Sequence, residues 1–172
     1  VKNNKNTLGF TIIELLVAIA LIGLLAVMTV MSVKRAKDRA YEAAAFQEIR
    51  GVAAALELYL NDSNGVFPPD VNRNIPPGLE DYLAPGEWPV APWPGSIYDW
   101  DNWWDANTGE YIYQISIRFC ELGQPETCQF PNEEWAEDFD INSSVYYCVQ
   151  GACRAHINKP PSHPGFCINC GG

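Results

Sequence analysis

Basic residues are scarce in most of this 172-residue chain. Residues 51–172 contain four lysines and arginines against seventeen aspartates and glutamates, whereas residues 1–50 contain seven basic and four acidic residues. The formal net charge is −10. Because an acidic surface repels the phosphate backbone of nucleic acids, we expect no general nucleic-acid binding by residues 51–172.

Patterns that support catalysis are also missing. The chain has two histidines, His156 and His163, and it shows no Ser-His-Asp arrangement, phosphate-binding loop or paired-carboxylate cleft. Both histidines are expected to be surface or tail residues. The sequence therefore predicts a protein that is not an enzyme. Its content of 48% hydrophobic and 12% aromatic residues argues against a disordered chain.

Charge is absent from Leu15 to Val33, a run of 19 residues within the apolar segment 10–33. A helix of about 20 apolar residues crosses the hydrocarbon core of a bilayer. A cleavable secretory signal is not favoured, because the apolar run continues where small residues should mark the cut. Lys2 and Lys5 favour a cytoplasmic N-terminus. The basic residues on the other side oppose that orientation: Lys34, Arg35, Lys37 and Arg39.

Glu14 interrupts the beginning of this apolar segment. A carboxylate inside a membrane costs a few kcal/mol on insertion scales. Two interpretations remain open from this residue alone. Either Glu14 reaches the membrane surface, since it lies one helical turn inside, or it is functional and has a charged partner.

The residues around Glu14 carry a family resemblance. A lysine-containing leader ends at Gly9, and Phe-Thr-Ile-Ile-Glu-Leu-Leu-Val-Ala-Ile-Ala follows over residues 10–20. This pattern resembles the N-terminus of type IV prepilins and of type II secretion pseudopilins. The resemblance implies that a prepilin peptidase cuts between Gly9 and Phe10 and methylates the new terminus at Phe10. It also implies that Glu14 pairs with the terminal amine of a neighbouring subunit during filament assembly.

The same resemblance implies an α+β type IV pilin fold, in which a long N-terminal helix packs on a small antiparallel sheet. We expect a cytoplasmic leader over residues 1–9, a membrane and filament-core helix over 10–33, its continuation over 34–62, and a globular head over 63–172. Many family members have a proline in the apolar helix, but the first proline here is Pro68. We therefore expect a straighter helix, with Gly23 as its weak point.

The predicted helix covers 50 residues, Thr11 to Leu60, or about 75 Å at 1.5 Å per residue. Apolar residues recur at helical spacing in its second half and predict a face that packs on a core. These residues are Ile49, Val52, Leu56, Tyr59 and Leu60, and the opposite face carries Arg39, Glu42, Arg50 and Glu57.

A proline-rich loop is predicted over residues 66–95, anchored by aromatic side chains, with a polyproline-type ligand as the alternative. Strands are predicted over residues 110–119 and 144–149, and a shorter one around 154–157. Together they suggest an antiparallel sheet of about three or four strands.

Six cysteines follow: Cys120, Cys128, Cys148, Cys153, Cys167 and Cys170. An exported head should oxidise them, and six cysteines allow 15 pairings. Sequence neighbours favour Cys120–Cys128, Cys148–Cys153 and Cys167–Cys170. Two alternatives stay open. Cys167 and Cys170 have the spacing of a thiol oxidoreductase, and Cys153, His156, Cys167 and Cys170, with His163 nearby, could bind zinc.

An acidic window precedes the first predicted strand. Its oxygen-bearing side chains are Asp99, Asp101, Asp105, Asn107 and Glu110. The spacing is similar to that of a helix-loop-helix calcium loop, but Trp104 occupies the position that needs glycine. Some pseudopilins that this chain resembles bind calcium in a head loop. No cofactor is required, and a calcium site of another geometry and a solvated acidic turn remain the alternatives.

The sequence as a whole predicts a structural subunit of a type IV pilus-type filament. From the resemblance we expect it to enter the inner membrane as a single-pass precursor with its head outside the cytoplasm and then to join a periplasmic or extracellular filament. Its expected partners are identical or related pilins, the prepilin peptidase and methyltransferase, and the inner-membrane assembly machinery. The alternatives are a major pseudopilin of type II secretion and a membrane-tethered minor or tip pilin that acts as a binding module.

Overall fold

The structure is a computed structural model that describes residues 9–84, 86–119, 130, 144–154 and 166–170. Two compact units divide the chain, residues 1–37 and residues 38–172. The described elements are one long helix, a single 3-10 turn and a four-stranded sheet. These elements confirm the predicted α+β, pilin-like class.

The helix α1 spans Ile12–Asp62 (51 residues), close to the predicted range. No proline or run of β-branched residues interrupts it, and alanine and leucine favour the helical backbone. It ends where Asn64 and Gly65 adopt positive φ angles of 56° and 80°. The Gly65 N–H then donates to the carbonyl oxygen of Leu60 at 2.7 Å, which satisfies one of the last helical carbonyls.

The second unit is built around the end of α1. Buried side chains on one face of the helix are Ala45, Ile49, Val52, Ala53, Ala55 and Leu56. This confirms the predicted apolar stripe, and Tyr59 and Leu60 pack partly buried against the same core. Arg39, Arg50 and Glu57 are exposed as expected, whereas Glu42 is half-buried.

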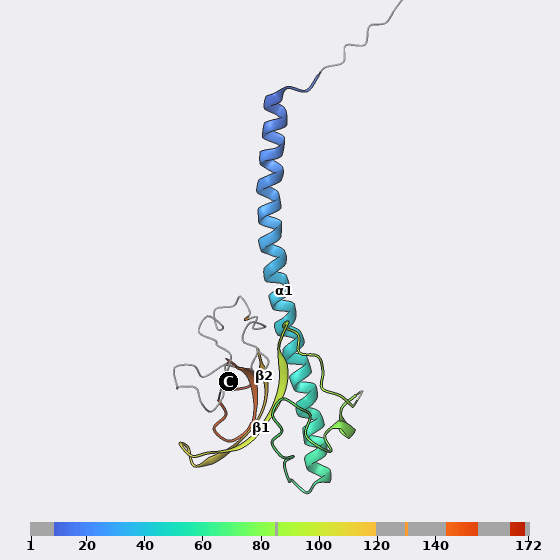
Figure 1. Ribbon diagram of the computed structural model, residues 1–172, viewed down its shortest axis with the longest axis vertical. Helices are drawn as coiled ribbons and strands as arrows, with labels where there is room; N and C mark the ends of the chain where they lie inside the picture. Colours follow the sequence, from blue (N-terminus) through green and yellow to red (C-terminus); the bar gives the residue numbers. More distant parts are fainter. Residues whose placement is uncertain (1–8, 85, 120–129, 131–143, 155–165, 171–172) are drawn as a thin grey trace, which may run out of the picture. The chain divides into compact units, whose positions relative to one another are not determined.

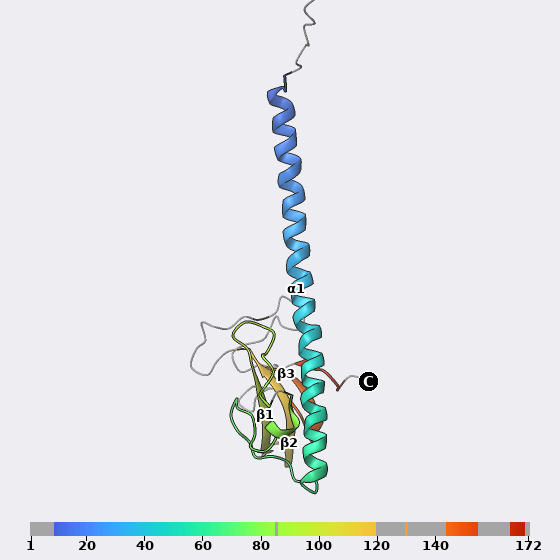
Figure 2. The same ribbon diagram turned by 90° about the vertical axis from the view of Figure 1, so that its right-hand side faces the viewer.

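The sheet has the order β1-β2-β3-β4 and lies beside the C-terminal part of α1 (Figure 1 and Figure 2). Its strands are β1 (Ile97–Asp105), β2 (Glu110–Arg118), β3 (Ser144–Gln150) and β4 (Phe166–Cys167). β1 and β3 both pair with β2 in antiparallel fashion, while β4 pairs with β3 in parallel. The sheet is therefore mixed rather than wholly antiparallel.

Two of the predicted strands, 110–119 and 144–149, are confirmed as β2 and β3. The prediction of a strand at 154–157 is wrong at Arg154, which follows β3 without strand structure, and residues 155–157 lie outside the described residues. β1 was missed, because its alternating acids resembled a turn. The fourth strand is instead the two-residue β4, which a local pattern of this length cannot predict.

Alternation along β1 and β2 gives the sheet two different faces. One face packs against α1 with Tyr98, Trp100, Ile115 and Ile117, all fully buried. The other face carries polar side chains that are also buried. The proline-rich segment is hydrogen-bonded to β1. The carbonyl oxygen of Pro68 accepts from Trp100 Nε1 at 3.1 Å and from Asn102 Nδ2 at 2.7 Å. This segment is therefore an anchored loop, as predicted, and it contains the 3-10 turn η1 (Glu80–Tyr82).

Candidate functional site

The N-terminal segment places an exposed backbone directly before the helix. Gly9 and Phe10 are outside α1, and Phe10 is 82% exposed. A glycine lets an extended backbone approach a peptidase closely, since it has no side chain. The Gly9–Phe10 bond is therefore exposed and lies outside the helix.

Thr11 and Glu14 close the first turn of the helix by a reciprocal contact. The backbone N–H of Thr11 donates to Glu14 Oε2 at 2.9 Å, and the backbone N–H of Glu14 donates to Thr11 Oγ1 at 3.2 Å. The Thr11 hydroxyl also donates to Glu14 Oε2 at 2.9 Å. This is a capping box, which satisfies two otherwise unpaired amides at the helix start. Within the described part of the chain, Glu14 Oε1 remains open to a further donor.

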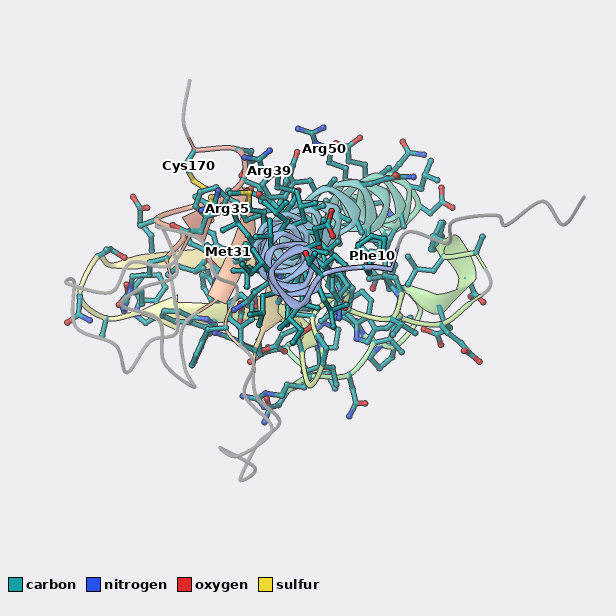
Figure 3. The ribbon with its side chains drawn as sticks, turned by 90° about the horizontal axis from the view of Figure 1, so that it is seen from above. Phe10, Met31, Arg35, Arg39, Arg50 and Cys170 are labelled. Carbon is teal, nitrogen blue, oxygen red and sulfur yellow. A yellow bond between two sulfur atoms is a disulfide. The ribbon has the colours of Figure 1, made fainter. Side chains whose placement is uncertain are left out.

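From this point to Val33, α1 presents apolar side chains on every side. Large hydrophobic residues from Leu15 to Val33 are between 52% and 69% exposed, and in Figure 3 they radiate around the helix axis near Phe10 and Met31. Among the described residues, α1 is the helix long and apolar enough to cross a membrane. So much exposed apolar surface needs a lipid or protein environment.

The acidic window lies on the sheet rather than in a loop. Asp99, Asp101 and Asp105 belong to β1, while Asn107 lies in the turn that follows and Glu110 begins β2. The three aspartates are at most 5% exposed. The expected solvated turn is therefore restricted to residues 106–110, and the aspartates belong to a buried polar face.

Arg118 neutralises two of these aspartates from the neighbouring strand. Its Nε lies 3.0 Å from Asp99 Oδ2, and its Nη2 lies 2.8 Å from Asp101 Oδ1. Asp101 Oδ2 accepts further hydrogen bonds from Gln114 and Ser116, both at 2.9 Å. Burial alone would lower the pKa of Arg118, but the two carboxylates outweigh it and raise the pKa. The guanidinium is therefore firmly charged.

A second arginine, Arg154, forms an ion pair at the end of β1, next to the turn that leads into β2. Arg154 Nε lies 3.0 Å from Asp105 Oδ2, and its guanidinium lies 5.4 Å from the centre of the Trp103 ring. The hydrogen bond from Arg154 is the main reason that the pKa of Asp105 is lowered. The Arg154 backbone also exchanges hydrogen bonds with the Gln114 side chain, so it is fixed to β2.

These contacts do not fit a calcium loop. Asp99 and Asp101 face Arg118, Asp105 faces Arg154, and Asn107 and Glu110 are exposed. Calcium needs six to eight oxygen ligands around one point. Among the described residues, no group of three or more histidines, cysteines, aspartates or glutamates is arranged to hold a metal ion.

Asp70 extends the acidic cluster from the loop. Partial burial, followed by the nearby carboxylates of Asp101 and Asp99, raises the pKa of Asp70 to about 6. The raised pKa means that the folded protein binds this proton more tightly than the unfolded chain. The stability that protonated Asp70 contributes is present below its ordinary pKa of 3.8 and is lost as the pH rises through about 6.

We expect Asp70→Asn to stabilise the protein at pH 7.5 and to have little effect near pH 4. Asparagine removes the charge that the neighbouring carboxylates oppose, and about 1 kcal/mol is expected after allowance for solvent screening. Urea unfolding followed by tryptophan fluorescence at both pH values measures the change. Asp81→Asn, an exposed carboxylate in η1, is the matched control. Equal effects of Asp70→Asn at the two pH values would contradict the electrostatic explanation.

Two of the predicted disulfides are confirmed, Cys148–Cys153 and Cys167–Cys170. Cys120 and Cys128, the third predicted pair, lie outside the described residues. Asn169, inside the second disulfide loop, accepts from the Cys148 N–H at 2.8 Å and donates to its carbonyl at 2.7 Å. The Asn169 side chain thus pairs with the Cys148 backbone as a neighbouring strand would. It links the loop closed by Cys167–Cys170 to the strand that carries the other disulfide.

The alternative of a zinc site at the cysteines is wrong, because the cysteines that the structure describes are oxidised. Cys153, Cys167 and Cys170 are all in disulfides, whereas zinc needs thiolates. His156 and His163 lie outside the described residues. Cys167 ends β4 rather than preceding a helix, so no helix dipole is available to lower a thiol pKa there.

The important residues that sequence reasoning missed are Arg118 and Arg154. Residues 51–172 contain only four basic residues, and an arginine between Ile117 and Phe119 in a predicted strand is unusual unless it is paired. The scarcity of basic residues could have indicated that Arg118 is paired. It could not identify Asp99 as the partner, since Asp99 lies 19 residues away in the sequence.

Comparisons with known proteins give two matches. Residues 4–30 match the family model described as the prokaryotic N-terminal methylation motif. The chain is also similar to the type II secretion system core protein G of Pseudomonas aeruginosa, with 38% identity over 60 residues. That alignment covers 35% of this chain and 42% of the relative, so the chain spans less than half the length of the relative it matches. No solved structure matches significantly.

Proposed function

We propose that this chain, which carries the prokaryotic N-terminal methylation motif, is a non-enzymatic structural subunit of a type IV pilus-type filament. The observation that carries the proposal is the coincidence of this motif with an accessible Gly9–Phe10 bond and an exposed apolar helix. A prepilin peptidase removes residues 1–9, and Phe10 becomes the methylated terminus. Copies of α1 then bury their apolar surfaces against one another in the filament core.

Glu14 has two roles in this proposal. In the single chain it completes the capping box with Thr11. After cleavage, the new amine of Phe10 is a cation at a helix N-terminus, where the helix dipole disfavours positive charge. A nearby carboxylate offsets that cost, and pairing with the amine of a neighbouring copy offsets the burial of both charges. The open Glu14 Oε1 is the atom available for this contact.

The substitutions Glu14→Ala and Glu14→Gln test the charge pairing. Glutamine can preserve the capping box, since it also caps helix starts, but it lacks the charge. We expect both variants to be made and retained in the membrane at the wild-type level, and to be missing from sheared or purified filaments. Immunoblots of the membrane and filament fractions measure this. Normal incorporation of Glu14→Gln would show that Glu14 serves only as a cap.

A type II secretion pseudopilin is the second candidate, and the similarity to core protein G favours it. A pseudopilin filament stays in the periplasm, whereas a pilus extends from the cell. Under both candidates the precursor spans the inner membrane once, with the acidic head outside the cytoplasm. Its partners are copies of itself or related pilins, the peptidase and methyltransferase, and the membrane assembly machinery. Filament location by immunoelectron microscopy distinguishes the two.

A further inference from the structure

A surface groove in the second unit combines carboxylates with apolar side chains. It encloses about 370 Å³ between α1 and the segment that follows η1. Glu48 and Glu87 supply its charges, Val52, Leu83 and Pro89 supply apolar surface, and Tyr82 supplies an aromatic ring. We call this the acidic groove. Tyr82 is held in place because its hydroxyl donates to Asp62 Oδ2 at 2.8 Å.

Among the described residues, no salt bridge joins a lysine or arginine to Glu48 or Glu87. Residues 74–117 contain seven acidic residues and no lysine or arginine. Arg50 is the nearest arginine along α1, but two residues of helix rotate it about 200° away from Glu48. In Figure 3 it accordingly points away from the segment that carries η1.

This lining suits an arginine side chain. The methylenes of arginine pack along apolar surface while the guanidinium remains at the polar end. The flat guanidinium also binds carboxylates in a fork and stacks on an aromatic ring. Glu48 is already oriented, since Tyr98 donates a hydrogen bond to its Oε2 and burial raises the pKa of that tyrosine. Glu87 is exposed and is available to an incoming cation.

Four exposed cations lie close together on α1. Lys34, Arg35, Lys37 and Arg39 form what we call the basic collar, directly after the uncharged run that ends at Val33. All four side chains are exposed. Arg35 and Arg39 are four residues apart in one helix, a spacing that places two side chains on the same face. Arg118 and Arg154 are buried or half-buried and are paired with aspartates of the same chain.

We propose that the acidic groove of one copy of this chain binds Arg35 or Arg39 from the basic collar of a second copy. This inference rests on the proposed function, in which copies of α1 pack side by side. Packing of the apolar segments brings the adjacent collar of each copy to the surface of its neighbours. The charges are complementary, because the collar is basic while residues 51–172 carry a large acidic excess. The contact between groove and collar thereby determines which surfaces of two neighbouring copies face each other.

Charge reversal and exchange in the full-length chain test the inference in the native host. The variants are Glu87→Arg, the pair Arg35→Glu with Arg39→Glu, and the combination of all three. Glu110→Arg is the matched control, because it makes the same charge change at an exposed acid outside the groove. Glu87→Gln is a milder variant, and tryptophan fluorescence checks that each head is folded. Filament yield relative to subunit in the membrane is measured.

We expect Glu87→Arg and the collar pair each to lower filament yield by about tenfold or more, since like charges then meet. The combined variant should recover most of the yield, and Glu110→Arg should resemble wild type. Wild-type yield from Glu87→Arg would overturn the inference while leaving the proposed function intact. Loss of membrane retention in the collar pair alone would assign the collar to anionic lipid headgroups and also overturn it. Failure of the wild-type chain to assemble would refute the proposed function itself.

Discussion

Replacing Arg118 with methionine is expected to lower the free energy of unfolding by about 3–5 kcal/mol at neutral pH. The side chain is 1% exposed, and it is the cation that pairs with both Asp99 and Asp101. Methionine fills similar space but leaves two buried carboxylates without a counter-charge. Burial and the charge of Asp101 already raise the pKa of Asp99 with the arginine present. The loss should therefore shrink at lower pH, where Asp99 takes up a proton.

Urea unfolding of the full-length chain in detergent measures this loss through tryptophan fluorescence. All six tryptophans lie beyond residue 87, so the signal reports the second unit. The triple variant Arg118→Met, Asp99→Asn, Asp101→Asn is the control for charge. It should recover much of the stability, because it removes the uncompensated carboxylates together with the arginine. A loss below about 1 kcal/mol in Arg118→Met would contradict the role given to this ion pair.

Gly151→Ala is expected to be similarly damaging, with a loss of about 3–5 kcal/mol. Gly151 follows β3 and has a φ angle of +87°, which L side chains rarely adopt. A Cβ atom there would overlap the carbonyl oxygen of Tyr111 and lie 3.1 Å from its carbonyl carbon. That backbone is part of β2, so relief of the clash requires movement of the strand pairing.

Gly109→Ala is the matched control for this substitution. Gly109 also has a positive φ, +71°, but no atom lies within 4 Å of the position of its Cβ. Alanine at Gly109 should therefore cost only about 1–2 kcal/mol, from the left-handed backbone alone. The same urea experiment compares the two variants. Equal losses would show that steric overlap with Tyr111 adds nothing to the conformational cost.

The long helix could be predicted because its signals are local. Uncharged apolar residues, high helix propensity and the spacing of Ile49, Val52 and Leu56 all lie within one segment. Two disulfides could be predicted for a similar reason, since their cysteines are five and three residues apart. The predicted start of the helix, Thr11, lies one residue before the observed start of α1 at Ile12.

The remaining features depend on contacts between distant residues. β1 resembled a calcium loop because its aspartates recur at a spacing similar to that of calcium ligands, and only Arg118 in β2 explains why Asp99 and Asp101 are buried. β4 is two residues long, and its parallel pairing is fixed by Asn169 and the docking on β3. A local pattern identified neither strand, so a correct prediction needed the tertiary partners.

The central claim is that a prepilin peptidase processes this chain, and mass spectrometry of its N-terminus tests that claim most directly. The protein should be isolated from the native envelope without reductant, and both the intact mass and the terminal peptide measured. We predict a chain that begins at Phe10, carries one methyl group on its amine, and has its cysteines oxidised in pairs. A chain that retains residues 1–9 with an unmodified Phe10, isolated from assembled or membrane-bound protein, would contradict the filament-subunit assignment.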